Sequence, residues 1–339
     1  MIRFLPNYKR FVIISIAFGV WTTWLIVLSP ASAFSHFFSN WQVALTMVFG
    51  STVAGATSLG GGAVAFPVLT KLLHVASHDA KVFSLAIQSV GMGAATAAIC
   101  LTRIKVEWKV VLWGSLGGIL GIWLGLGLFA PFLPPDVLKM SFTFMLASFG
   151  ITLLALNRVE RECHSQIPVW RMQEKLIVFG AGLLGGIMSG LVGNGIDIFA
   201  FAAMVLLFRM SEKVATPTSV ILMAFNAMVG LTLQVFIFRD FTTVVQSYWF
   251  AAIPVVVVGA PFGAMLCSRM SRQTIANILI SLVGIELITS LLLIPLTLKV
   301  VSSSVTMLLI CSYLNYLMYR NQSYELLPIQ QNLGYENYK

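Results

Sequence analysis

The chain is dominated by apolar stretches that match the length of a membrane-crossing helix. A bilayer core is about 30 Å thick, so a helix that crosses it needs about 20 mostly apolar residues. Only 10% of the residues are charged, against roughly 25% in soluble domains. The pattern excludes a water-soluble globule and predicts an all-α integral membrane protein. The apolar runs cover residues 11–28, 41–73, 82–102, 109–130, 137–156, 175–209, 215–238, 245–267, 274–295 and 300–319.

The basic residues are distributed as topology signals. Lys and Arg exceed Asp and Glu by 21 − 12, which gives a net charge of +9. In a soluble protein this excess can indicate nucleic-acid binding, but here the charges lie singly or in small groups at the ends of apolar runs. We therefore expect the lipid bilayer as a partner and no nucleic acid. The four cysteines have no metal-ligand or disulfide spacing, so we expect no metal and no cofactor.

The longest polar gap, residues 157–174, divides the apolar sequence into two halves. The first apolar run ends near Ala31-Ser32-Ala33, which fits a transmembrane helix and also a cleaved signal peptide. The predicted units are 1–40 (N-terminal helix and external loop), 41–156 (first repeat), 157–174 (cytoplasmic linker), 175–295 (second repeat) and 296–339 (C-terminal helix and cytoplasmic tail).

The two halves resemble each other. Gly60-Gly61-Gly62 interrupts the run 41–73, and Gly193-Asn194-Gly195 interrupts the run 175–209 at the equivalent place. Two repeats, each made of one broken or hairpin segment and three ordinary helices, are the simplest description. Gly-x-x-x-Gly pairs also recur in the next-to-last helix of each half, at Gly121 and Gly125 and at Gly259 and Gly263.

The interrupted runs decide the topology. If each crossed the membrane once, the 21 Lys and Arg residues would divide 12 to 9, which is hardly a bias. If each enters and returns as a hairpin, 16 of the 21 lie on one side. The positive-inside rule therefore favours hairpins, with both termini in the cytoplasm. The second repeat then starts on the opposite side from the first, so the repeats are inverted, as in many secondary transporters.

The second arms of the hairpins, about 63–77 and 196–209, are short for a full crossing. Irregular backbone at membrane depth is tolerated only where it is buried in protein or faces a water-filled cavity. We therefore expect the two glycine turns to meet inside the protein, near the midplane.

The first glycine turn also resembles a known family. The segment from Leu59 to Pro67, the Ala80–Ser84 segment and the weaker echo at Gly193-Asn194-Gly195 are similar to the TauE/SafE family of sulfite and organosulfonate exporters, over about residues 41–295. The resemblance implies a secondary transporter for small sulfur-containing anions. The second repeat departs from the pattern at Asn194, at Ala200 where the proline would fall, and at Asp197.

The glycine turns can bind an anion for physical reasons. A broken helix leaves backbone N–H groups unpaired and exposes a partial positive charge, and glycine lets the backbone approach a ligand closely. The alternative is that these glycines only allow close helix packing, which we favour for Gly114, Gly117, Gly118, Gly121, Gly125 and Gly263. The candidate substrate-binding residues are Gly60, Gly61, Gly62, Pro67, Ser84, Gln88, Gly193, Asn194, Gly195, Thr216, Thr218, Ser219 and Asn226.

Several of these residues have a structural alternative. The Ser and Thr hydroxyls could instead bond carbonyls of their own helices. Pro217 is interpreted as marking the first turn of a helix. Asp197 is a proton or cation site, a protonated carboxyl that lines the pathway, or a helix cap for the 196–209 arm. Glu286 lies inside an apolar run and is interpreted as a buried structural partner or an interfacial residue, with a role in transport as the alternative.

The sequence argues against an enzyme. It has no H-E-x-x-H, no G-x-S-x-G and no nucleotide-binding P-loop. We expect a multi-pass permease of the cell membrane that exports sulfite or organosulfonates by alternating access around the glycine turns, with a homodimer left open. The alternative is a membrane-embedded binding or assembly protein without transport activity.

Overall fold

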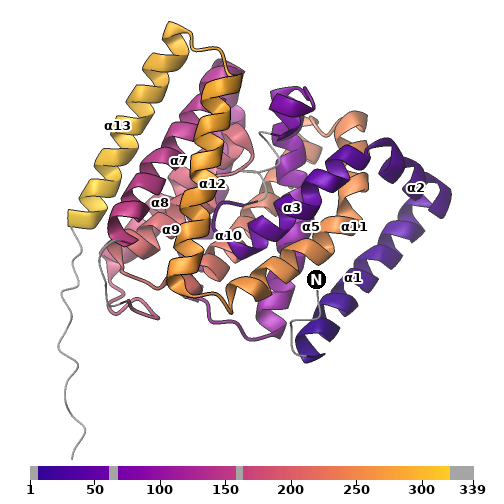
Figure 1. Cartoon of the computed structure of the whole chain (residues 1–339), viewed down its shortest axis with the longest axis horizontal. Coiled ribbons are helices and arrows are strands. Elements are labelled where there is room, and N and C mark those ends of the chain that lie inside the picture. Colours follow the sequence, from indigo (N-terminus) through magenta and orange to yellow (C-terminus); the bar gives the residue numbers. More distant parts are fainter. Residues whose placement is uncertain (1–6, 61–67, 158–162, 321–339) are drawn as a thin grey trace, which may run out of the picture.

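The computed structural model describes residues 7–60, 68–157 and 163–320, and within them it is built of helices (Figure 1). Nine of these helices are long and apolar enough to cross a membrane, which confirms the predicted all-α membrane fold. The elements are α1 (Asn7–Leu28), α2 (Pro30–Ser39), α3 (Trp41–Ala56), η2 (Val68–Leu72), α5 (Ser77–Leu101), α6 (Trp108–Leu124), η3 (Gly125–Phe129), η4 (Ala130–Phe132), α7 (Pro135–Asn157), α8 (Met172–Val192), α9 (Ile196–Ala202), η5 (Ala203–Leu207), α10 (Glu212–Thr232), η6 (Leu233–Phe238), α11 (Thr243–Cys267), α12 (Arg272–Leu293) and α13 (Leu298–Arg320).

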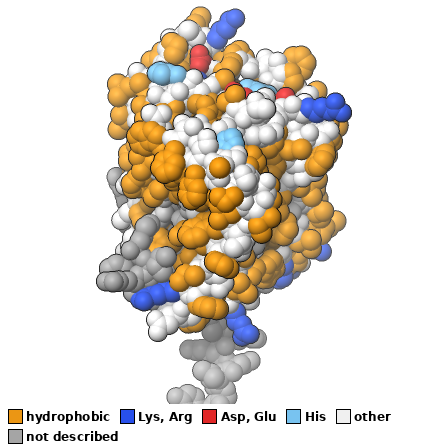
Figure 2. Space-filling view, turned by 90° about the vertical axis from the view of Figure 1, so that its right-hand side faces the viewer, with side chains coloured by type: hydrophobic (Ala, Val, Ile, Leu, Met, Phe, Trp, Pro, Cys, Tyr) orange, Lys and Arg blue, Asp and Glu red, His pale blue; other side chains and the backbone are white. Residues whose placement is uncertain are grey.

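The surface of the bundle suits a bilayer. Hydrophobic side chains cover the middle of the face in Figure 2, whereas the Lys and Arg side chains in this view lie toward its top and bottom. Large apolar residues such as Ile26 and Leu292 are exposed on the outside of the bundle. Apolar surface of this extent marks a membrane-contacting region.

The first broken segment starts and finishes at one end of the bundle. Asn40, just before α3, donates from Nδ2 to Ser247 Oγ at 2.8 Å, and His78 in the first turn of α5 lies 3.4 Å from Asp240. Both partners lie at the start of α11, so α3 and α5 begin beside each other there. We call this side of the molecule the α11 end.

The second broken segment starts and finishes at the opposite end. Lys175 in α8 stacks over the ring of Trp113 in α6, with Nζ 5.5 Å from the ring centroid. Thr218 in α10 accepts a hydrogen bond at 2.9 Å from the backbone N–H of Glu107, just before α6. Helices α8 and α10 therefore both begin beside the start of α6. We call this side the α6 end; it lies across the bundle because α5 runs from one end to the other.

Glycines hold the broken segments against their neighbours, as the packing interpretation expected. A Cβ atom added at Gly121 of α6 or at Gly125 of η3 would collide with backbone atoms of α8, and one at Gly263 of α11 would collide with the backbone of α3. Close approach of this kind is the use that Gly-x-x-x-Gly pairs have in membrane helices. Helix α11 thus packs on α3, which begins the first broken segment, as α6 packs on α8, which begins the second. This correspondence supports an inverted duplication, which stays a prediction.

Two local expectations differ from the structure. The predicted loop before residue 41 contains a short helix, α2, which starts at Pro30 where a proline is tolerated. Pro217 is not in a first turn, because α10 begins at Glu212 and the proline lies inside it. Ser211 followed by an acidic residue is the helix-start signal that the sequence interpretation overlooked.

Candidate functional site

The tips of the two broken segments touch inside the protein. Asn194 donates from Nδ2 to the carbonyl oxygen of Leu59 at 2.5 Å. Gly60 has a φ of 68°, and a Cβ there would lie 2.7 Å from Asn194 Oδ1 and 2.8 Å from Asp197 Oδ2. The prediction that the two turns meet is therefore confirmed at Gly60 and Asn194. Gly61, Gly62 and Pro67 lie outside the described residues.

Helix α5 supports the second turn with two polar side chains. Ser84 donates from Oγ to the carbonyl oxygen of Gly193 at 3.1 Å, and Gln88 donates from Nε2 to the same oxygen at 2.9 Å. Gly193 ends α8 with a φ of 84°, and Gly195, with a φ of 150°, precedes α9. Glycine adopts such positive φ values readily because it has no Cβ. Helix α5 thus positions the second glycine turn.

Helix α10 brings four predicted site residues into the core, but two are occupied structurally. Thr218 and Ser219 donate to carbonyl oxygens of their own helix, at 2.7 and 2.8 Å. Thr216 is fully buried, and Asn226 is 3% exposed. The residue of α10 that reaches the first turn is one that sequence reasoning missed: the sulfur of Met223 would lie 2.7 Å from a Cβ at Gly60.

Buried polar atoms without a hydrogen-bond partner surround the two tips. Within the described residues they include Ser58 Oγ, Asn194 Oδ1, both carboxyl oxygens of Asp197, and Asn226 Oδ1. Buried polar groups in native proteins are nearly always paired, so a group of exceptions needs an explanation such as a bound solute, proton or water. Unpartnered buried atoms also occur elsewhere in the described residues, for example at Gln234, so the group at the tips is a candidate site for a polar ligand.

Asp197 lies at the centre of this region. Its side chain is inaccessible to solvent. Gly195 holds the N-cap position of α9, and Ser189 Oγ accepts a hydrogen bond at 3.1 Å from the backbone N–H of Ile196, the first residue of that helix. The carboxyl group lies against the backbone N–H groups of residues 195, 197 and 198, outside hydrogen-bond geometry. Its position in the first turn, without a capping hydrogen bond, leaves the carboxyl group available for a proton or a ligand.

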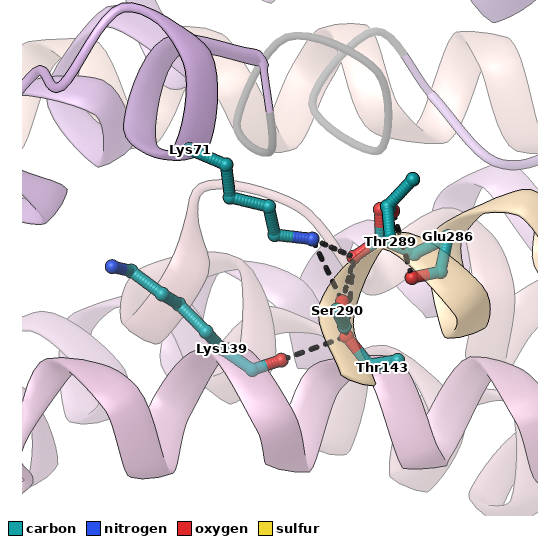
Figure 3. Close-up of polar contacts among 6 residues, drawn as sticks. All are labelled: Lys71, Lys139, Thr143, Glu286, Thr289 and Ser290. Atoms are coloured by element: carbon teal, nitrogen blue, oxygen red, sulfur yellow. Dashed lines mark hydrogen bonds and ion pairs between the residues drawn. The ribbon is translucent and has the colours of Figure 1, made fainter. Parts of the chain in front are cut away.

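A second buried polar cluster lies between η2 and α12 (Figure 3). Helix η2 belongs to the second arm of the first broken segment, which we call the return arm. Lys71 donates from Nζ to Ser290 Oγ at 2.7 Å and lies 3.3 Å from Glu286 Oε1. Thr143 of α7 and Ser290 donate to the same carboxyl oxygen at 3.1 and 2.9 Å. The interpretation of Glu286 as a buried structural partner is thereby confirmed. Its partner Lys71 was missed, because among the predicted topology charges it looked like any external lysine.

The fold and site together define a polytopic α-helical membrane protein with two broken segments that meet in its core. A family model described as sulfite exporter TauE/SafE matches residues 43–291. This is most of the chain, and it covers both broken segments, so the chain belongs to that family of membrane transporters. A transporter family fits the expectation that the protein is not an enzyme. Comparison with curated proteins found no match, and comparison with solved structures found none either.

Proposed function

We propose that the protein exports small sulfur-containing anions, sulfite or organosulfonates, by alternating access around the two glycine turns. The observation that carries the proposal is the contact between Asn194 and Leu59, because it joins the tips of two segments that enter from opposite ends. Broken segments that meet at mid-depth are the usual place for substrate in secondary transporters. Rocking one half against the other would expose this region to each end in turn.

The substrate class follows from the family and from the chemistry of the turns. The family model is described as a sulfite exporter, and backbone N–H groups at a helix break suit an oxyanion. A membrane potential of about 100 mV, negative inside, drives one negative charge outward with about 2.3 kcal/mol. That energy sustains roughly a fifty-fold gradient, at 1.4 kcal/mol per tenfold. Export of an anion therefore needs no coupling ion.

Asp197 is proposed as a proton site in this pathway. An ionised carboxylate beside the turns would repel an anion, whereas a protonated one carries no charge and can donate a hydrogen bond to it. Neither carboxyl oxygen of Asp197 has a hydrogen-bond partner among the described residues, which supports this role over that of a simple cap. A proton held on Asp197 would thus favour binding of the anion; because that proton stays on the carboxyl group, the anion still moves as one net negative charge.

The orientation in the membrane is part of the proposal. Lys105 contacts Ser165 and Arg272 contacts Cys163, so loops that carry the predicted cytoplasmic charges lie together at the α6 end. The positive-inside rule then places the α6 end and both termini in the cytoplasm, and the α11 end outside the cell membrane. A homodimer stays a prediction.

The decisive experiment is flux. The purified chain, reconstituted in proteoliposomes, should move radiolabelled sulfite or sulfoacetate in response to a membrane potential, and empty liposomes provide the background. Sulfate in a parallel assay measures selectivity among oxyanions. A folded protein that moves none of the three would overturn the proposal and leave the non-transporting binding or assembly protein.

A further inference from the structure

A buried lysine lies beside the second glycine turn. Lys81, in the second turn of α5, is 6% exposed. Its carbonyl oxygen would lie 2.8 Å from a Cβ at Gly193, so its backbone touches the turn. An ammonium group in such a place loses much of its hydration, and the usual compensation is a paired anion.

Within the described ranges, no carboxylate lies within 4.0 Å of the Lys81 ammonium group. The basic residues that do form ion pairs at that distance include Lys71, His78, Lys139 and Arg272. The carboxylate whose charge acts on Lys81 is Asp240, which lies 3.4 Å from His78. The contrast with Lys71 is direct, because that lysine is also buried but is paired with Glu286 at 3.3 Å.

Lys81 lines a small pocket at the α11 end. The pocket has a volume of about 120 Å³ and is lined by Ser77, His78, Lys81, Ala130, Leu133, Pro135, Leu138 and Leu191. About 10–15 Å³ on this measure is enough for one water molecule, so the pocket has room for an oxyanion of a few heavy atoms. Exposed His78 lies at its rim, and Leu191 lies near the end of α8, two residues before the glycine turn.

The pocket continues into the proposed site along one face of α5. Ser77, Lys81, Ser84 and Gln88 have the spacing of residues that share a helix face, and the last two donate to the carbonyl oxygen of Gly193. The stripe starts with half-buried Ser77 and ends with buried Gln88. It thus connects the surface of the α11 end with the second turn.

From these contacts we infer that Lys81 forms a second anion site, a vestibule at the α11 end that receives the sulfur oxyanion on its way from the turns to the outside. The anion would pair with the Lys81 ammonium in the pocket. Apart from Lys81 and His78, the lining has no ionisable side chain, so the positive charge of Lys81 favours anions over neutral solutes. This inference rests on the proposed function for its direction, and on the unpaired lysine in the pocket for the site itself.

The test uses the full chain and sulfite in two assays. In proteoliposomes, Lys81→Met should raise the half-saturating sulfite concentration measured from the α11 end by about tenfold or more, as expected for losing a hydrogen-bonded charge in a buried place. Lys299→Met is the matched control, because Lys299 is exposed at the same end. In detergent, calorimetry should show weaker sulfite binding for Lys81→Met and unchanged binding for Lys299→Met.

Chemical rescue separates a lost charge from a lost shape. Lys81→Cys should respond in opposite directions to two alkylating reagents, whose thioether products sulfite does not cleave: an aminoethyl group restores a cation and should restore affinity, whereas a sulfonatoethyl group adds an anion and should not. The unsubstituted chain, with its four native cysteines, is treated in parallel. This variant also serves if Lys81→Met does not fold.

The outcomes distinguish the inference from the function on which it rests. If the unsubstituted chain transports sulfite and neither Lys81 variant changes its affinity, the vestibule is wrong and the exporter stands. If the chain binds sulfite through Lys81 but moves none, the anion site stands and the exporter is wrong. If it neither binds nor moves sulfite, both are overturned.

Discussion

Lys71 and Glu286 form an ion pair at 3.3 Å that links the return arm of the first broken segment to α12. The carboxyl oxygen of this pair also accepts hydrogen bonds from Thr143 and Ser290. Breaking a buried pair on one side leaves an uncompensated charge, which costs more than the pair itself contributes. The pair therefore makes the position of the return arm depend on α12.

The first prediction is that the effect of replacing Glu286 on the free energy of unfolding depends on whether Lys71 is present. Glu286→Leu should lower the free energy of unfolding by about 3–5 kcal/mol, because Lys71 stays buried without a partner. Lys71→Met combined with Glu286→Leu should recover most of the loss. The measurement is the thermal unfolding of the purified variants in one detergent. A double variant as unstable as Glu286→Leu would show that the pair is not the cause.

The second prediction concerns the first turn. Gly60→Ala should reduce sulfite flux by about tenfold or more, since its Cβ would enter the space between Asn194, Asp197 and Met223. Those atoms lie toward the ends of side chains that can shift, so the protein should still fold, at a backbone cost of about 1–2 kcal/mol for the positive φ. Gly284→Ala is the control, because nothing lies within 4 Å of a Cβ there.

Gly193→Ala should behave differently from Gly60→Ala. Its Cβ would lie 2.8 Å from the carbonyl oxygen of Lys81 and 2.7 Å from Ser84 Cβ, in the middle of α5 packing. Backbone cannot shift as a side chain end can, so the yield of folded protein should fall as well as the flux. Size-exclusion chromatography of both variants, before reconstitution, makes the comparison. Equal yields and full flux in both would leave the glycines without any role at the tips.

Glycine spacing and charge distribution were enough to predict the broken segments and their contact. Those signals are local: a glycine turn in an apolar run, or a Gly-x-x-x-Gly pair, has the same meaning before and after folding. Ser84 and Gln88 were found because they follow the first turn at helical spacing. Lys71, Lys81 and Met223 were missed because their burial and partners arise from helices far away in the sequence, such as α12 and α8.

A third prediction tests the orientation of the bundle. Cys163 is half-buried in the loop at the α6 end, and Thr297 is exposed at the α11 end. In intact cells an impermeant maleimide should label Thr297→Cys, whereas Cys163 should react only after the membrane is permeabilised. Cys100 is also exposed, whereas Cys267 and Cys311 are buried, so both tests use a Cys100→Ser background. Labelling of Cys163 from outside would reverse the proposed direction of every helix.

The last prediction separates the two roles of Asp197. If the residue only stabilises the start of α9, Asp197→Asn should keep most of the flux and stability, because Asn suits a helix start about as well as Asp. If it binds a proton during transport, the amide cannot titrate, and the substitution should remove the pH dependence of flux.

The measurement is sulfite flux against pH for the unsubstituted chain and Asp197→Asn in matched liposomes, at a fixed membrane potential. Sulfite itself changes protonation near neutral pH, so a sulfonate, whose charge is constant over that range, serves as the second substrate. A pH dependence that both substrates share, and that the substitution abolishes, would assign the proton to Asp197. Identical profiles for the two proteins would instead leave a uniporter driven by the membrane potential. We expect the shared dependence, since the carboxyl group lies beside the Gly60 turn with no hydrogen-bond partner among the described residues.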